Sequence, residues 1–236
     1  MSQAVTAEAD FTESTPQSAP DSPRTLAEAW RVFVRHGSPR FLLVLSGVTL
    51  IARFTVGGWS LADLLLTAAI FAFWPVQEWL IHVFILHYEP IRLGGRTIDF
   101  AVPISHRAHH RDPWNIDILF IPVQGFTLSL PLLGAIAFGL LPTTGLALTG
   151  LAFYMLMSLR YEWVHFLVHT RYRPQSEYFR RLWRNHRLHH CKNERYWFGV
   201  TMLGGDRLLG TSPDPATAPL SSTCRTLGIE SEEGLD

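Results

Sequence analysis

The sequence has few of the residues that define several common classes of protein. It holds 2 cysteines, Cys191 and Cys224, so it has no disulfide framework, and neither stands in a Cys-x-x-Cys metal or redox pair. Charged residues make up 17% of the 236 residues, against roughly 25% in an average soluble protein. The 20 basic and 20 acidic side chains cancel, so the positive charge typical of nucleic-acid-binding proteins is missing. We therefore expect a lipid environment and no nucleic-acid partner.

The composition divides the chain into a central domain and two tails. Residues 1–24 are rich in Ser, Thr, Pro and acidic residues and have too little apolar surface to offset the entropy cost of ordering, so we expect a disordered tail. This segment lacks the basic and apolar regions of a secretory signal, and we expect it to be retained. Residues 212–236 are similar and predict a flexible C-terminal tail. Residues 25–211 form the predicted domain.

Four apolar stretches dominate this domain. A helix crosses the hydrocarbon region in roughly 20 residues, so three stretches are long enough, and the first is marginal because Arg53 interrupts it. Short turns without Lys or Arg pair the stretches as two hairpins. The stretches are residues 41–56, 61–87, 118–141 and 143–169. They predict an all-α, multi-pass membrane bundle of about four transmembrane helices.

Basic residues predict the orientation of this bundle. They precede the first hairpin at 31–40, separate the two hairpins at 92–111 and follow the second at 171–195. By the positive-inside rule these segments are cytoplasmic, so both termini and a cytosolic helical cap are expected on that side. The alternative is a soluble bundle whose buried helices are apolar on all sides.

Ten of the 11 histidines fall into four clusters, and His36 stands alone. The spacings are His-x4-His, His-x2-His-His, His-x3-His and His-x2-His-His. Residues three or four apart lie on one face of a helix, so the members of a cluster can reach a common point. An even number of membrane crossings separates the clusters, which places all of them at one membrane face. The clustered residues are His82, His87, His106, His109, His110, His165, His169, His186, His189 and His190.

The first cluster departs from helical spacing. His82 and His87 are five residues apart and would point roughly 140° apart on a regular helix. Either they reach different metal ions, or His87 lies where the helix breaks before Pro90.

Metal coordination explains why so many imidazoles would lie together. Packed imidazoles repel one another when protonated and lack partners when neutral, and shared metal binding removes both problems. Ten ligands are too many for one ion and suit a di-metal site, with about four or five ligands for each ion. Glu78 and Glu162 stand near His82 and His165, where each carboxylate can either accept a hydrogen bond from a ligating imidazole or form an ion pair on its helix.

The ordered clusters resemble those of the fatty acid hydroxylase and sterol desaturase superfamily, which are membrane-bound, histidine-rich di-iron oxygenases. The resemblance covers roughly residues 71–211. Phe198-Gly-Val-Thr201 and Asp206-x-x-x-Gly-Thr211 are similar to the ending common in the fatty acid hydroxylase branch. Gly204-Gly205 stands where that branch often has a Leu-Trp pair.

This resemblance implies a non-heme di-iron monooxygenase that hydroxylates a lipid from the bilayer, above all a fatty acyl chain, with O2 as co-substrate. Breaking an unactivated C–H bond requires a redox metal, which no side chain replaces. Imidazoles suit zinc as well as iron, but zinc has no redox chemistry, so two iron ions are expected, with zinc as an alternative occupant. The sequence contains no cytochrome b5-like segment, so a separate electron donor is expected, either a ferredoxin or a cytochrome b5-like protein.

Two side-chain sets have further predicted roles beside the clusters. Six residues on the second and fourth stretches match a lipid chain below the site: Phe71, Phe73, Trp74, Phe153, Tyr154 and Met155. Six arginines form a basic strip that can face anionic headgroups or an acidic electron carrier: Arg171, Arg173, Arg180, Arg181, Arg184 and Arg187.

Two other functions stay open at this point. The same histidine spacing occurs in sterol- and carotenoid-modifying oxygenases and desaturases, so the substrate could be a ring. In a different class, a histidine-lined bundle could be a metal transporter or sensor. A transporter needs polar groups near the bilayer midplane, whereas these histidines lie at the ends of the stretches.

Overall fold

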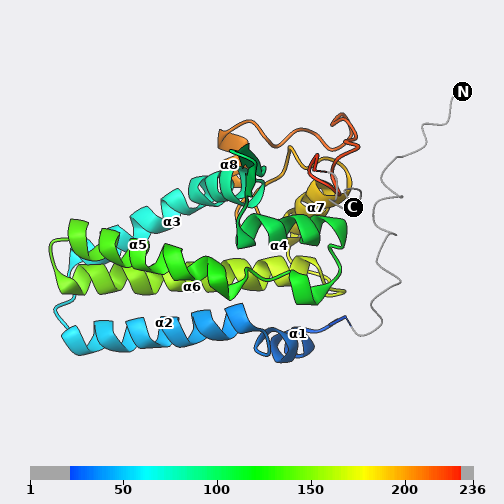
Figure 1. Ribbon diagram of the computed structural model, residues 1–236. Coiled ribbons are helices and arrows are strands. Elements are labelled where there is room, and N and C mark those ends of the chain that lie inside the picture. The colour runs from blue at the N-terminus through cyan, green and yellow to red at the C-terminus, as the bar shows by residue number, and fades with distance from the viewer. Residues whose placement is uncertain (1–21, 230–236) are drawn as a thin grey trace, which may run out of the picture.

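Four helices run side by side along the length of the molecule (Figure 1). They are α2 (Gly37–Val56), α3 (Leu61–Ile81), α5 (Phe126–Leu140) and α6 (Thr144–Val168). The computed structural model describes residues 22–229. The predicted disordered N-terminal tail therefore lies outside the described residues as far as Asp21. Short turns join α2 to α3 and α5 to α6, as predicted, but α2 and α3 both pack mainly against α6.

Shorter elements gather at one end of this bundle and contain the histidine clusters. The helical ones are α1 (Leu26–Phe33), the π-helical turn η1 (His82–Leu86), α4 (Ala101–Arg111), the 3₁₀ turns η2 (Ile116–Ile118) and η3 (Val123–Gly125), α7 (Glu177–Cys191) and α8 (Gly204–Leu208). Strands β1 (Ile91–Leu93) and β2 (Arg96–Ile98) form an antiparallel hairpin in which Ile91 lies opposite Ile98.

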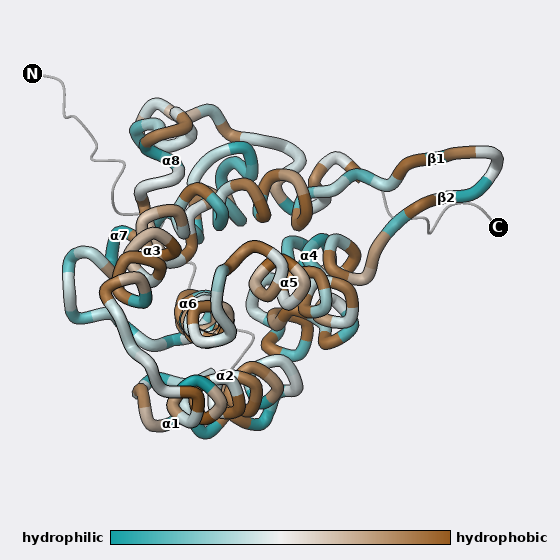
Figure 2. The backbone as a smooth tube through the Cα atoms, turned by 90° about the vertical axis from the view of Figure 1, so that its left-hand side faces the viewer, coloured by the Kyte–Doolittle hydropathy of each residue, from teal (hydrophilic) through white to brown (hydrophobic). Residues whose placement is uncertain are grey.

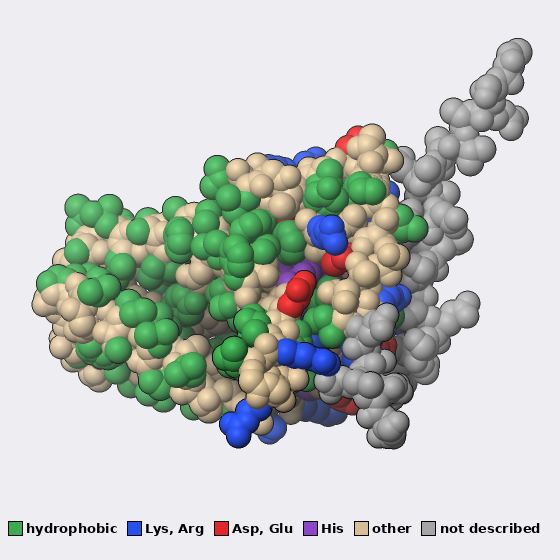
Figure 3. Space-filling model, turned by 45° about the horizontal axis from the view of Figure 1, so that its top comes forward, with side chains coloured by type: hydrophobic (Ala, Val, Ile, Leu, Met, Phe, Trp, Pro, Cys, Tyr) green, Lys and Arg blue, Asp and Glu red, His purple; other side chains and the backbone are tan. Residues whose placement is uncertain are grey.

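Three segments of the described chain are long and apolar enough to cross a membrane: Gly37–Val56, Leu61–Leu86 and Ile116–Leu140. Helix α6, the fourth predicted stretch, is not among them. It lies at the centre of the bundle, where it packs against α2, α3 and α5 (Figure 2). Hydrophobic side chains cover the bundle end of the molecule, whereas charged side chains gather at the opposite end (Figure 3).

Arg53, which interrupts the first apolar stretch, is buried between three helices. Its guanidinium donates to the Asp63 carboxylate at 2.8 Å and to the Thr149 hydroxyl at 2.6 Å, and it lies 3.7 Å from the centre of the Trp59 ring. Asp63 also closes the capping box of α3 with Ser60. This polar group joins α2, α3 and α6, so the charge in the apolar stretch is neutralised inside the protein.

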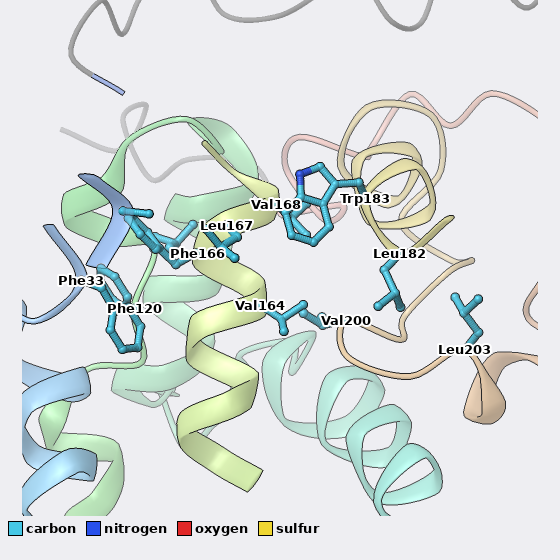
Figure 4. Close-up of a cluster of buried hydrophobic side chains, with 12 residues drawn as sticks. Phe33, Phe120, Val164, Phe166, Leu167, Val168, Leu182, Trp183, Val200 and Leu203 are labelled. Atoms are coloured by element: carbon cyan, nitrogen blue, oxygen red, sulfur yellow. The ribbon is translucent and has the colours of Figure 1, made fainter. Parts of the chain in front are cut away.

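The main apolar core surrounds the C-terminal part of α6 (Figure 4). Phe33 of α1 packs against Phe166 of α6 and Phe120, with ring centres 5.8 Å from each. Leu182 and Trp183 bring α7 into the same cluster. Burial of this surface fixes α1 and α7 against α6, and thereby fixes the helices that carry the last two histidine clusters.

Residues 212–229, which belong to the predicted C-terminal tail, pack against the end of α7. Lys192 donates to the carbonyl of Pro215, and the Asn193 side chain donates to the carbonyl of Pro219 at 3.0 Å. Cys224 and Leu227 are buried. Composition gives no signal for these contacts, because hydrogen bonds from polar groups of the domain help to hold the segment. Residues 230–236 lie outside the described part of the chain.

Candidate metal centre

The ten clustered histidines converge at one end of the bundle, from η1, α4, the end of α6 and α7. All are buried except His87, which is half-buried. They form two groups of five, and within each group the potential ligand nitrogens lie within 4.8 Å of one another. The first histidine group is His82, His87, His106, His110 and His189, and the second histidine group is His109, His165, His169, His186 and His190.

The two His-x2-His-His triplets are each divided between the groups. In α4, His106 and His110 belong to the first group and His109 to the second. In α7, the division is reversed, because His186 and His190 belong to the second group and His189 to the first. The sequence predicts that a triplet can reach one common point, whereas the structure places the second histidine of each triplet in the neighbouring group.

The spacing of His82 and His87 is resolved by the π-helical turn η1. The His87 amide donates to the His82 carbonyl at 3.0 Å, which is the five-residue hydrogen bond of a π-helix, a feature frequent at functional sites. The wider turn brings the two ring centres to 5.0 Å. Both residues consequently belong to the first group, and His87 lies where the regular helix ends.

The unpaired nitrogens of these rings fit metal ligation. In the first group the Nε2 atoms of all five histidines are buried without a hydrogen-bond partner among the described residues. In the second group the same holds for His109, His165 and His169, while the Nε2 atoms of His186 and His190 face each other at 3.1 Å. Buried polar atoms without a partner are costly, and a metal ion would satisfy them.

Backbone carbonyls orient three of the rings. The Nδ1 atom of His82 donates to the Phe198 carbonyl at 2.7 Å, that of His110 to Cys224 at 2.8 Å and that of His189 to Tyr196 at 2.8 Å. A proton held on Nδ1 leaves the Nε2 lone pair free for a metal. The sequence gives little signal for these carbonyls, because any residue type can supply one.

Burial in this environment favours the neutral form of the imidazoles. Burial lowers the pKa of His109, His186 and His190 well below the ordinary value, and the neighbouring imidazoles lower it further. Burial likewise lowers the pKa of His110 to about 3. Metal binding requires the neutral form of histidine, so the protonation state suits the proposed role.

Glu78 and Glu162 have partners other than the imidazoles and ion pairs that the sequence suggests. Glu78 accepts hydrogen bonds from the amides of Val200 and Thr201 at 2.6 Å. Glu162 accepts from the Ser38 hydroxyl at 2.6 Å and from the Ile121 amide at 3.2 Å. Both carboxylates therefore hold loop backbones beside the histidines, and Glu78 acts on His82 only through the loop that contains Phe198.

The segment Phe198–Thr201 is fixed by a second carboxylate. Asp206 accepts from the amides of Phe198 at 2.9 Å and Gly199 at 2.7 Å, and from the Thr211 hydroxyl at 2.7 Å. A Cβ on Gly199 would overlap the Met202 carbonyl, so only glycine fits this turn. The segment that resembles the family ending thus has a structural role, because its Phe198 carbonyl accepts a hydrogen bond from the ring of His82.

Gly204 and Gly205 allow α8 to lie directly on α3. A Cβ on Gly205 would overlap the carbonyl oxygen of Pro75, and one on Gly204 would lie 3.3 Å from the Pro75 side chain. In this chain the pair therefore supplies a close backbone contact where the family often has two large side chains.

A small cavity reaches both histidine groups. It has a volume of about 20 Å³, and a water molecule needs about 10–15 Å³. His106 of the first group and His165 of the second group line it together with Tyr161, and most of its remaining lining is apolar. Such a cavity admits a small molecule but not a lipid chain. The six predicted lipid-contact residues are not among the described residues that line it.

The described chain thus combines three helices long and apolar enough to cross a membrane with two histidine groups that could hold metal ions. The model of the family described as fatty acid hydroxylase matches residues 67–211. The chain belongs to this family. Together with three apolar helices long enough to span a membrane, family membership supports an integral membrane protein.

Two relatives give the comparison more detail. The ceramide very long chain fatty acid hydroxylase SCS7 of Saccharomyces cerevisiae is 32% identical over 149 residues, which are 63% of this chain and 38% of that protein. The chain thus spans less than half the length of this relative. A solved structure described as full-length scs7p, with only the hydroxylase domain visible, has a TM-score of 0.60 at 25% identity and covers 85% of this chain and 70% of that chain.

Proposed function

We propose that the protein hydroxylates a lipid, with a fatty acyl chain as substrate and O2 as co-substrate, at a pair of iron ions. The observation that carries this proposal is the pair of adjacent groups of five buried imidazoles inside a domain of the fatty acid hydroxylase family. Each histidine group would hold one ion. A bound iron pair would supply the oxygen activation that side chains lack.

The protein's own residues would hold and shield this pair. The carbonyls of Phe198, Tyr196 and Cys224 keep three ligands in one tautomer. The Phe198 ring lies 5.4 Å from His82 and 5.3 Å from His189, between ring centres. This apolar cover excludes water from one side of the first group, which limits competing reactions of a reactive oxidant.

The cavity beside His106 and His165 is the proposed place of the reacting carbon. Its lining residues Leu86, Val102 and Ile118 are apolar and belong to η1, α4 and η2. The turns η1 and η2 lie at the ends of two segments able to cross a membrane. To reach this cavity from the bilayer, a lipid chain would have to separate η1, α4 and η2. Phe71 and Phe73 are exposed on α3, so they fit lipid contact on the outer surface better than substrate contact.

An acyl chain is favoured over a ring by the yeast relative, whose name states a very long chain fatty acid substrate. The sterol- or carotenoid-modifying alternative retains the same metal site and differs in the product. The transporter or sensor alternative is less consistent with the structure, because the histidines gather at one end of the bundle rather than along a path through it.

Metal analysis and lipid analysis together test the proposal. The protein purified without oxygen should contain iron at both groups, and lipids from an expressing strain should gain a hydroxylated acyl product. His189→Ala should remove the product, and His36→Ala should retain it, because His36 lies between α1 and α2, outside both histidine groups, and bonds the Val32 carbonyl. A strain with an oxidised ring product instead would identify the alternative substrate. A metal-loaded protein without any oxidised lipid would overturn the proposal.

We further propose that the exposed face of α7 receives an acidic electron donor of the ferredoxin or cytochrome b5 type. Arg180, Arg181 and Arg184 are exposed on α7, which carries three ligands on its buried face. Arg187 of the predicted strip is instead held inward, where it donates to the Val168 and Thr170 carbonyls. Reversing the three exposed charges should slow turnover and weaken its salt dependence. Unchanged turnover and salt dependence would contradict this docking site.

By the distribution of arginines, we propose that the histidine groups and both termini face the cytoplasm. Cysteine labels on the described cap, for example at exposed Ala216, should react with an impermeant reagent only after cells are opened. Reaction in intact cells would reverse the proposed orientation.

A further inference from the structure

The hairpin β1–β2 projects from the body of the protein beside the metal centre. It links η1 to α4, and so lies between His87 and His106 of the first group. Figure 2, which views the bundle along its length, shows the hairpin extending sideways, away from all the helices. Its strands therefore run across the direction of the membrane-crossing segments.

One face of this hairpin carries three apolar side chains beside Arg96, and no other described residues cover it. Side chains alternate between the faces of a strand, so Ile91 and Leu93 share a face with Ile98 and Arg96 across the pair. Ile91 is 53% exposed, Leu93 67% and Ile98 39%. Because an isolated two-stranded hairpin is marginally stable in water, this apolar face needs a further partner.

The apolar face continues the surface that lipid covers. Large apolar side chains are exposed in the turn η1 that precedes the hairpin, at Phe84 (63%) and Ile85 (49%), and two residues after β2 at Phe100 (55%). Phe84 and Ile85 belong to Leu61–Leu86, a segment able to cross a membrane. The hairpin thus begins where a membrane-crossing segment ends, which is the depth of the lipid headgroups.

The charges of the hairpin fit the same location. Arg92 lies on the face opposite the three apolar side chains, and Arg96 lies next to the turn at Gly94 and Gly95. Arginine side chains at this depth can extend toward lipid phosphates while their stems stay in apolar surroundings. Of the two acidic neighbours, Asp99 is already paired with Arg107, so it does not neutralise the two arginines, and Glu89 is exposed before β1.

We propose that the β1–β2 hairpin lies in the membrane interface, with Ile91, Leu93 and Ile98 against the acyl chains and Arg92 and Arg96 toward anionic headgroups. The base of the hairpin is fixed to the metal centre, because Arg107 of α4 pairs with Asp99 and donates to the Tyr88 carbonyl at 3.0 Å. Lipid contact would thereby steady the connection between His87 and His106. The proposal depends on the membrane location alone and not on the metal or the reaction.

Fluorescence quenching in nanodiscs that hold one full-length chain tests this proposal. A polarity-sensitive dye would be attached at Leu93→Cys, in bilayers of phosphatidylcholine and phosphatidylglycerol with or without a doxyl-labelled lipid as quencher. Leu132→Cys, 59% exposed on α5, gives the lipid reference, and Ala216→Cys gives the water reference. Wild-type protein treated alike gives the background from Cys191 and Cys224.

The dye at Leu93 should lose fluorescence about as strongly as the dye at Leu132, and a dye at Thr97→Cys on the opposite face should lose less. In an Arg92→Gln/Arg96→Gln background, the loss at Leu93 should become smaller and independent of phosphatidylglycerol. Loss at Leu93 no greater than at Ala216 would overturn the proposal. Protection from both lipid and aqueous quenchers, or efficient crosslinking of Leu93→Cys between chains in larger discs, would overturn it in favour of a protein partner or a second copy.

Discussion

His109 and His189 hold equivalent places in their triplets, and each joins the histidine group of the other half of the chain. The His109 ring lies 4.9 Å from His165 and 4.5 Å from His169, between ring centres. The His189 ring lies 4.6 Å from His82. Neither group is therefore complete without ligands from both the 82–110 and the 165–190 parts of the chain, so metal binding would tie these parts together.

Removing either exchanged histidine should affect mainly one metal. His109→Ala or His189→Ala is expected to lower the metal content of the purified protein by about half, because one group of five loses a ligand. Lipid product should disappear in both variants, since the reaction needs the pair. His36→Ala should change neither quantity. Normal metal content in the first two variants, measured by plasma mass spectrometry, would refute the ligand assignment.

Glu78 should be important for stability through the loop that it holds. Glu78→Ala leaves the buried amides of Val200 and Thr201 without their acceptor, which should cost about 2–5 kcal/mol. The unfolding temperature in detergent should fall, and a chelator should remove metal faster because Phe198 no longer positions His82. Glu78→Gln keeps one acceptor oxygen and should lose less. Equal effects of the two variants would show that charge, rather than hydrogen bonding, matters.

The two adjacent glycines of α8 should differ in their tolerance of a methyl group. Gly205→Ala places a Cβ against the Pro75 carbonyl, which is rigid backbone, and should destabilise the protein by about 1–3 kcal/mol. Gly204→Ala meets only the Pro75 side chain at 3.3 Å and should be tolerated. Thermal unfolding of the two variants gives the comparison, and equal stability would exclude the close packing of α8 on α3.

The buried pair of Arg53 and Asp63 should be sensitive to removal of one partner. Arg53→Met leaves the Asp63 carboxylate buried without its guanidinium and should destabilise the protein by about 3–5 kcal/mol. The double variant Arg53→Met/Asp63→Leu should recover part of this loss, because no lone charge remains. The unfolding temperatures of both should be compared with wild type. A double variant less stable than Arg53→Met would mean that the Ser60 and Thr149 contacts of Asp63 matter more than its charge.

The metal-free protein should lose stability in acid. The pKa of His110 is lowered to about 3, and that of His186 and His190 well below the ordinary 6.5, by burial. Between these values the unfolded chain binds more protons than the folded one, so stability falls as the pH drops from about 6.5 toward 3. Unfolding temperature against pH, with and without metal, should show this slope. Bound metal should shift this loss of stability to lower pH. An unfolding temperature that does not change with pH would contradict buried, neutral histidines.

The histidine spacing predicts convergence at one end of a helical bundle, and the structure agrees because four short motifs near helix ends need only a hairpin topology to meet. The division into two groups of five could not be predicted. It depends on the rotation of α4 and α7 about their axes, which the packing of Leu182 and Trp183 against α6 decides for α7. The positions of His82 and His87 likewise needed the π-helical turn, whose wider spacing has no sequence marker here.

The roles of the acidic residues also required the tertiary structure. Glu78 and Glu162 were placed near histidines by their spacing, but side-chain direction depends on which loop packs beside each helix, and here both hold amides. The contacts of residues 212–229 likewise needed the tertiary structure, since the hydrogen bonds come from Lys192 and Asn193, which follow α7.

By itself, the sequence determined the chemistry available to this protein: apolar stretches long enough for a membrane, and ten imidazoles at spacings that suit helices. These are local properties, because hydropathy and helical periodicity depend only on residues close together in the chain. The tertiary structure decided which imidazoles share a group, which carbonyls fix their tautomers and where a cavity reaches both groups. Those relationships join residues a hundred positions apart, and only packing against common neighbours sets their distances.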